Sequence, residues 1–258
     1  MSDTFPSVFV SHGSPSMVLE DCPTRDFLKS LGGELGRPKA IVSVSAHWTT
    51  DTPRVTGQAR PQTIHDFGGF PEQLYRLRYP APGAPALAGS VLSLLREAGI
   101  TGETDPDRGL DHGAWAPLML IYPDADIPVV QLSVQPRLGA HHHLEMGKAL
   151  RPLRDEGILI LASGSATHNL GDFIGRALDA EPLPYAKEFA DWLKEAVVEG
   201  RANDLVDYER LAPHARRNHP TPEHFLPLLV AMGAGESGSV LHDGYTYGAL
   251  SMAAFKWE

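Results

Sequence analysis

Short apolar runs alternate with helical patterns along the chain, and this alternation constrains the fold more than any other feature. The runs lie at residues 8–10, 41–44, 127–132 and 158–161. Runs of this length with little polar alternation are typical of strands that are buried on both faces. Because buried strands separated by helices belong to sheets with helices on both sides, we expect an α/β fold.

Helical patterns occupy most of the sequence between these runs. In one of them Leu87, Val91, Leu94 and Leu95 share a face, and Gly99 is a natural stop. Further helices are predicted at residues 140–156, 184–199, 204–212 and 221–232, and closing strands at 239–241 and 249–255. The prediction is one domain over residues 1–258, with a central mostly parallel or mixed sheet flanked by helices on both faces.

Charge and cysteine content exclude several classes of partner and site. The formal net charge of −10 argues against nucleic acid and anionic membranes, because their phosphates attract clustered Lys and Arg. Cys22 is the only cysteine, so an intramolecular disulfide and a cysteine-rich zinc site are excluded. No apolar run approaches the ~20 residues of a membrane span, and the first ten residues lack the features of a signal peptide. We therefore expect a cytoplasmic protein.

Three histidines follow predicted strands, and a fourth lies at a predicted helix start. His12, His47 and His168 come at or just past the ends of apolar runs. His224 lies in HPTPEHFLP, where Thr221 can cap the helix. Ligands bind at the carboxyl ends of strands in open α/β sheets, and imidazole suits zinc and iron. These side chains are candidate metal ligands, with backbone-bonded strand-end histidines as the alternative.

Other histidines are weaker candidates. His112, in LDHGAW, is a candidate for contact with a substrate or with a metal ligand. His65 and Phe67 share a loop with further aromatic and glycine residues, which is either a pocket wall or a surface loop. Residues 141–143 are three consecutive histidines that point in different directions on a helix, so we expect them to be solvated.

Well-known catalytic motifs are absent from the sequence. There is no His-Glu-x-x-His zinc motif, no Gly-x-Ser-x-Gly elbow and no Gly-x-Gly-x-x-Gly dinucleotide loop. Ser14 and Ser165 lie in tight glycine-containing turns, so a Ser–His hydrolase is conceivable, although neither turn has the elbow sequence.

Six motifs, taken as an ordered set, resemble the DODA-type extradiol ring-cleaving dioxygenases, in the class that includes the catalytic subunit of protocatechuate 4,5-dioxygenase. They are SHGSP, SVSAHW, HDFGGFP, LDHGAWAPL, SGSATHNL and HPTPEHFLPL, and they run from Ser11 to Leu228. The terminal GALSMAAF is similar to the closing strand of that group. Each motif is weak alone, so the resemblance rests on the set.

The resemblance implies a role for each main histidine. His12, His47 and His224 match the metal ligands of that family. His168 matches the acid–base histidine beside the metal, with direct coordination as the alternative. Such a group is expected to have a pKa near neutrality. His112 matches a histidine on the substrate side.

By this resemblance the chain is an oxidoreductase that opens the ring of a small catechol and adds both atoms of dioxygen, giving a muconic semialdehyde. DOPA-like or related catechols are the first expected substrates. One divalent metal per chain is expected, with Fe²⁺ for turnover and Zn²⁺ as another occupant of an all-histidine site. The expected partners are the aromatic diol and dioxygen, and no pattern indicates a particular oligomeric state.

Two alternatives stand beside this interpretation. A zinc hydrolase on the same fold would need only the metal and His168 as base. A non-catalytic relative would bind metal without turnover, but such proteins usually lose ligands, and all four histidines are present here.

Overall fold

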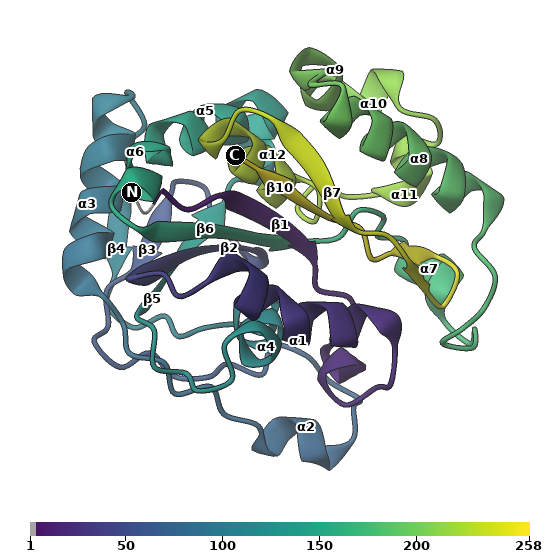
Figure 1. Ribbon diagram of the computed structural model, residues 1–258, viewed down its shortest axis with the longest axis horizontal. Coiled ribbons are helices and arrows are strands. Elements are labelled where there is room, and N and C mark those ends of the chain that lie inside the picture. The colour runs from purple at the N-terminus through teal and green to yellow at the C-terminus, as the bar shows by residue number, and fades with distance from the viewer. Residues whose placement is uncertain (1–3) are drawn as a thin grey trace.

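A large mixed sheet forms the centre of the molecule in the computed structural model, which describes residues 4–258 (Figure 1). Within these residues the sheet has eight strands in the order β4-β3-β5-β2-β6-β1-β10-β7. The strands are β1 (Ser7–Ser11), β2 (Ala40–Thr49), β3 (Arg54–Thr56), β4 (Glu103–Asp105), β5 (Val129–Val134), β6 (Ile158–Gly164), β7 (Gly238–His242) and β10 (Ala254–Trp257). A separate ribbon pairs β8 (Tyr245–Thr246) with β9 (Leu250–Ser251).

The middle of the sheet is parallel and its margins include antiparallel pairs. β2 pairs in parallel with β5 and β6, and β6 pairs in parallel with β1. The pairs β1–β10, β10–β7 and β3–β5 are antiparallel, whereas β3 and β4 are parallel. The carboxyl ends of β1, β2 and β6 therefore meet at one edge of the sheet, where the fold can gather side chains from distant segments.

Helices cover both faces of this sheet (Figure 1). On one face α12 (Leu226–Ala234) packs against β6, β1 and α5 (Gly139–Leu150), and α3 (Pro85–Glu97) packs on α5 and β3. On the other face α4 (His112–Ile121) packs against β2, β6 and α1 (Pro23–Leu35). The remaining helices are α2 (Glu72–Arg76), α6 (Pro152–Asp155), α7 (Leu170–Phe173), α8 (Pro184–Val198), α9 (Ala202–Val206), α10 (Tyr208–Leu211) and α11 (Ala215–Asn218), with short 3₁₀ helices η1 (Pro15–Val18) and η2 (Pro136–Leu138).

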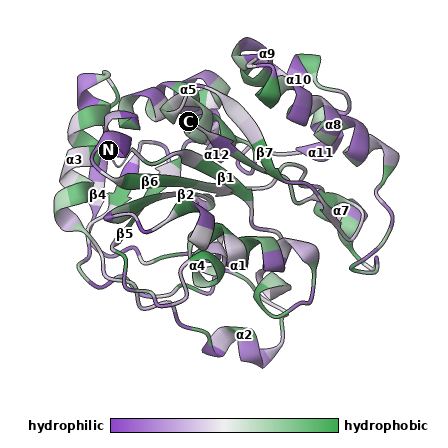
Figure 2. Cartoon of the chain, viewed as in Figure 1, coloured by the Kyte–Doolittle hydropathy of each residue, from purple (hydrophilic) through white to green (hydrophobic). Residues whose placement is uncertain are grey.

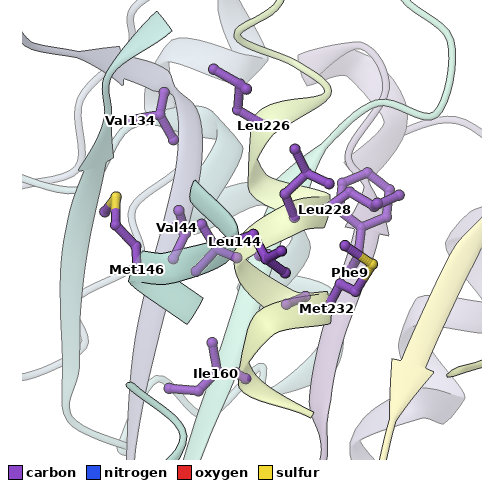
Figure 3. Close-up of a cluster of buried hydrophobic side chains, with 14 of the residues drawn as sticks. Phe9, Val44, Val134, Leu144, Met146, Ile160, Leu226, Leu228 and Met232 are labelled. Atoms are coloured by element: carbon purple, nitrogen blue, oxygen red, sulfur yellow. The ribbon is translucent and has the colours of Figure 1, made fainter. Parts of the chain in front are cut away.

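Apolar side chains from the sheet and its covering helices form the core. Figure 2 shows the central strands as largely hydrophobic. Figure 3 shows Phe9, Val44 and Ile160 from three strands beside Leu228 of α12 and Leu144 of α5. Each such side chain contributes roughly 1.5–3 kcal/mol when it is fully buried. α12 is apolar on all sides and buried throughout, as expected for a helix inside a domain rather than on its surface.

The structure confirms the predicted α/β fold with a mixed sheet and helices on both faces. The four apolar runs lie within or overlap β1, β2, β5 and β6. Three helix predictions were wrong in detail. The helix predicted at residues 204–212 is two short helices, α9 (Ala202–Val206) and α10 (Tyr208–Leu211). The helix predicted at residues 140–156 is divided before Pro152, because proline cannot donate the helical N–H.

The third correction concerns the helix start near His224. Thr221 does not cap a helix at Pro222; its hydroxyl donates to Oε1 of Glu223 instead. α12 begins only at Leu226, with Pro227 in its first turn. A helix that began at Pro222 would place Pro227 in its interior, where a proline breaks the hydrogen-bond ladder. His224 consequently lies in the turn before the helix.

Candidate metal and catalytic site

Three histidine rings converge at the carboxyl ends of the central strands. His12 directly follows β1, His47 lies near the end of β2, and His224 precedes α12. The Nε2 atom of His47 is 2.9 Å from Nε2 of His12 and 3.2 Å from Nε2 of His224. The rings of His12 and His224 are buried and that of His47 is partly buried. Three nitrogen atoms from segments far apart in the sequence thus face one point.

The outer nitrogen of each ring faces an oxygen atom. The Nδ1–oxygen distances are 2.9 Å from His12 to Ser163 Oγ, 3.6 Å from His47 to Asp66 Oδ2 and 3.1 Å from His224 to Glu223 Oε1. A carboxylate can only accept a hydrogen bond, so Nδ1 of His224 carries the proton. Nδ1 of His47 is beyond hydrogen-bond distance of Asp66, but the negative charge it faces favours a proton on that nitrogen as well. Nε2 of these rings then presents a lone pair inward, as a metal ligand requires.

The chemistry of this cluster fits a divalent cation. Burial lowers the pKa of His12 and of His224 well below the usual value, with the neighbouring histidines adding to the effect. Burial, followed by the charge of His112, lowers the pKa of His47 to about 3. All three rings are therefore neutral at pH 7, as coordination demands. Nitrogens ~2.1 Å from one cation and at right angles to each other would lie about 3 Å apart, as Nε2 of His47 does from each of the other two.

Two glycines let the backbone bring these residues together. Gly13 follows His12 with φ of +59°, so the chain can turn immediately after the first histidine. Gly164 ends β6 beneath the turn that carries His224, and a Cβ there would lie 2.2 Å from the His224 carbonyl oxygen. The N–H of Ser165 donates to that same oxygen at 2.9 Å. The close approach of β6 thereby fixes the position of His224.

His168 lies beside the cluster rather than within it. Its ring stacks on that of His224 with centroids 3.4 Å apart and planes 10° apart. Burial lowers the pKa of His168 to about 4, although the charge of Glu223 opposes the shift. This shift runs away from the near-neutral pKa that the resemblance suggested, because partial burial disfavours the charged ring. At pH 7 His168 is a neutral base.

His112 and Asp66 form the opposite wall of the site. His112 is the first residue of α4, and its ring centroid lies 3.8 Å from that of His47. Asp66 accepts hydrogen bonds from the backbone N–H of His112 at 2.9 Å and from its Nδ1 at 3.0 Å. Burial acts to raise the pKa of Asp66, but these bonds and the charge of His112 prevail and lower it to about 2. Asp66 is therefore a carboxylate at neutral pH.

A buried polar network supports the wall that His112 and Asp66 form. Asp111 caps α4 and is fully buried; it accepts from Ser45 Oγ at 2.7 Å, from Arg108 at 3.1 Å and from the Gln131 side chain. Burial raises the pKa of the Asp111 carboxyl. The N–H of His47 donates to Ser45 Oγ at 3.1 Å, so the network joins β2 to the start of α4. It fixes the spacing between His47 and the helix that carries His112.

A cavity of about 240 Å³ opens onto these histidines. It lies below the roughly 300–1,000 Å³ range of common ligand pockets, so it suits a small ligand. Its apolar lining comes from Phe67, Phe70, Leu170, Phe173 and Leu250, and its polar lining includes His12, His47, Asp66, His112, Ser165 and His168. A planar ring fits between aromatic walls of this kind, with polar groups at one end.

Two histidines lie in environments that differ from those expected from the sequence. His65 is not among the residues that line the cavity; it lies behind Phe67, 5.7 Å from that ring, and its Nε2 is 3.2 Å from the Leu77 carbonyl oxygen. His143, expected to be solvated, is fully buried. Its Nδ1 donates to the Gly139 carbonyl at 2.7 Å, so it is a structural residue of α5.

Comparison with known proteins identifies the class to which this fold and site belong. Residues 6–255 match the family model described as the catalytic LigB subunit of aromatic ring-opening dioxygenase. The chain therefore belongs to this family of ring-opening dioxygenases, and the resemblance seen in the sequence is confirmed. The protein is an extradiol dioxygenase, an oxidoreductase of a metal-dependent family that acts on an aromatic substrate with dioxygen.

Individual relatives match over nearly their whole length. The 4,5-DOPA dioxygenase extradiol of Beta vulgaris is 46% identical, covering 96% of this chain and 95% of that protein. The protein of the same description from Escherichia coli K12 is 45% identical, covering 98% and 94%. A crystal structure of an uncharacterized protein from Escherichia coli K12 has a TM-score of 0.81 at 37% identity, covering 98% of this chain and 100% of that one.

Several site residues were not singled out from the sequence. Asp66 lies inside HDFGGFP, where the sequence pointed to the histidine and the aromatic residues rather than to the carboxylate. Leu170, Phe173 and Leu250 come from segments with no chemical motif and reach the cavity through the fold. Among residues 4–258, no helix is both long enough and apolar enough to span a bilayer.

Proposed function

We propose that the protein opens the ring of a small catechol at this cavity, with residues 1–258 acting as a single catalytic domain. In this proposal His12, His47 and His224 hold one ferrous ion, His168 moves protons and His112 contacts the substrate. The observation that carries it is the convergence of three neutral imidazoles at an aromatic-lined cavity, with Nε2 of His47 2.9 Å from that of His12 and 3.2 Å from that of His224.

The residues of the chain perform distinct tasks around the bound substrate. A ferrous ion supplies the redox chemistry between catechol and dioxygen, which zinc does not provide. His168 is neutral because burial lowers its pKa to about 4, so its ring is free to accept the proton of a catechol hydroxyl, whose own pKa a bound divalent cation would lower. Once protonated, it is a stronger acid than an ordinary imidazolium and returns the proton readily. One side chain thus serves both proton transfers.

The cavity walls favour a flat ring. Phe67 and Phe70 meet edge to face with centroids 5.2 Å apart, and Phe67 also meets His112 edge to face at 5.5 Å. These rings hold a planar substrate and exclude water from the reacting centre. DOPA-like catechols are the first substrates to test, because relatives at 43–46% identity carry the description 4,5-DOPA dioxygenase extradiol. The expected product is a muconic semialdehyde.

The two alternatives have weaker support. A zinc hydrolase would use the same ligands and His168, but the family match extends over residues 6–255 and belongs to ring-opening dioxygenases. A non-catalytic relative would be expected to lose part of the machinery, whereas His12, His47, His224 and His168 all reach the site.

Metal-dependent oxygen consumption tests the proposal. Metal-free protein would be reconstituted without oxygen with Fe²⁺ or with Zn²⁺, then mixed with aerated DOPA and a panel of other catechols. The ferrous form should consume oxygen in step with catechol and yield a product that absorbs visible light, and the zinc form should be inactive. Zinc-dependent ester or amide cleavage, together with no oxygen uptake by the ferrous form on any catechol, would contradict the proposal.

A further inference from the structure

Asp66 is the one carboxylate in the described chain, residues 4–258, that lies between a proposed metal ligand and a proposed substrate contact. Its Oδ2 is 3.0 Å from Nδ1 of His112 and 3.6 Å from Nδ1 of His47. We propose that Asp66 is a positioning residue that sets the tautomer of both rings. It holds a proton on each Nδ1, so that Nε2 of His47 faces the metal as a lone pair and Nε2 of His112 faces a substrate hydroxyl as an acceptor.

The contacts of Asp66 indicate that its carboxylate acts as a hydrogen-bond acceptor. Both oxygens only accept, and Oδ1 already receives the backbone N–H of His112 at 2.9 Å. Nδ1 of His112, 3.0 Å from Oδ2, must therefore be the donor, and the carboxylate charge 3.6 Å from Nδ1 of His47 favours a proton on that nitrogen. In a neutral imidazole the other nitrogen is then unprotonated. Metal-binding histidines commonly gain their orientation and basicity from such a carboxylate. Here one carboxylate would serve a ligand and a substrate-binding ring together.

The loop that carries Asp66 is anchored to the same helix as His112. The N–H of Ile64 donates to the Leu110 carbonyl at 2.7 Å, and Nε1 of Trp115 donates to the Ile64 carbonyl at 2.8 Å. Trp115 is fully buried within α4. These bonds tie the loop to α4 on both sides of His112, so Asp66 is held in place before any ligand arrives.

A second metal site is the main competing interpretation of this cluster. Ligand atoms of His47, Asp66 and His112 all lie within 4.8 Å of one another, close enough to consider a cation. That cation would have to displace the protons from Nδ1 of both rings. It would also compete with the backbone N–H that already occupies Oδ1 of Asp66. Without an ion, both Asp66 oxygens already have a donor from His112, and Nδ1 of His47 faces the charge of Oδ2 at 3.6 Å, so the contacts are explained by a positioning role.

Asp66→Asn tests the proposal because it preserves shape while it replaces a charged acceptor with a neutral amide that can donate. The amide offers a donor where the carboxylate has an acceptor, which favours the opposite tautomer of the facing ring. Zinc affinity would be measured by competition with a chromophoric chelator, a readout that does not depend on turnover. The surface variant Asp126→Asn, in an exposed pair with Arg37, is the matched control. Circular dichroism would verify that both variants fold.

The expected result is a zinc affinity about 10–100-fold weaker in Asp66→Asn than in the wild type and in Asp126→Asn. Zinc should bind at one ion per chain in all three proteins. A wild-type zinc affinity in Asp66→Asn would overturn the proposal. A stoichiometry of two ions per wild-type chain, falling to one in Asp66→Asn, would also overturn it and support the second metal site.

The substrate arm of this inference rests on the proposed function and has its own measurement. In the ferrous enzyme Asp66→Asn should raise KM for the catechol by a larger factor than it lowers kcat. The same substitution in a His112→Gln background should leave KM unchanged, because the ring through which Asp66 acts is gone. An equal rise of KM in both backgrounds would contradict the role of His112. If the wild type turns over no catechol, the proposed function fails while the zinc measurement still judges Asp66.

Discussion

A single methyl group on Gly164 should detach the third proposed metal ligand without touching any histidine. Gly164 ends β6 directly beneath the backbone of His224. A Cβ at this position would lie 2.2 Å from the His224 carbonyl oxygen and 3.1 Å from Cε2 of Phe9. Since Cβ atoms essentially never approach closer than 3.0 Å, Gly164→Ala must open the 2.2 Å gap by at least 0.8 Å.

This displacement is large compared with the tolerance of a metal site. Ligand distances vary by only about ±0.2 Å around their preferred values, so a ligand moved by several times that amount no longer coordinates well. We expect the affinity for zinc to fall about 10–100-fold, the usual loss when the support of a ligand is disturbed. Overpacking of the core should also lower the free energy of unfolding by roughly 1–3 kcal/mol.

The two effects can be measured separately. Chelator competition gives the zinc affinity, and urea denaturation in the presence of a strong chelator gives the stability of the metal-free protein. Gly89→Ala in α3 is the control, because a Cβ there would meet no atom within 4 Å. That control should keep its zinc affinity and gain up to about 1 kcal/mol of stability. Wild-type zinc affinity in a folded Gly164→Ala protein would refute the account of how His224 is placed.

Three further predictions concern proton transfer, the cavity wall and pH. His168→Gln should retain metal but lose turnover by roughly 10²–10⁴-fold, and parallel loss of metal would instead make His168 a ligand. Phe67→Ala should change the ranking of catechols by kcat/KM more than it changes metal content, and an unchanged ranking would count against this wall. Burial lowers the pKa of His143 to about 4, so the unfolded chain binds a proton below pH 6.5 that the folded protein excludes. His143 therefore lowers the free energy of unfolding as pH falls from 6.5 towards 4, by roughly 3 kcal/mol at most. His143→Asn should make the free energy of unfolding less dependent on pH in this range. Equal pH dependence of the two proteins in urea denaturation would contradict this prediction.

The sheet was largely predictable because its central strands are buried on both faces. The apolar runs in β1, β2, β5 and β6 can be recognised as strands from the sequence without knowing which strands pair. α1 and α4 escaped prediction for different reasons. α4 is apolar on almost every side, contains Pro117 and is buried at all positions but one, so it shows no helical periodicity. α1 carries Gly32 and Gly33 in its second half, which weakens the helical signal.

For the site, the residues with distinctive chemistry could be predicted from the sequence, whereas those placed by the geometry of the fold could not. His12, His47, His168 and His224 were singled out because strand ends and motif resemblance mark them. The partners that orient these rings, Ser163, Asp66 and Glu223, were not singled out. They approach the histidines through the fold, and residues of these types are common on protein surfaces. The low pKa of His168 was equally inaccessible, because it depends on how completely the stacked His224 ring and the cavity walls exclude water.

The central claim is that this cavity opens a catechol ring with dioxygen, and isotope labelling tests it most directly. The ferrous enzyme would turn over DOPA, or the catechol it consumes fastest, under ¹⁸O₂. The product would be reduced at once, because an aldehyde oxygen exchanges with water, and then weighed by mass spectrometry. The account predicts a ring-opened product carrying both labelled oxygen atoms. A product without ¹⁸O, or an intact ring oxidised to a quinone, would contradict it.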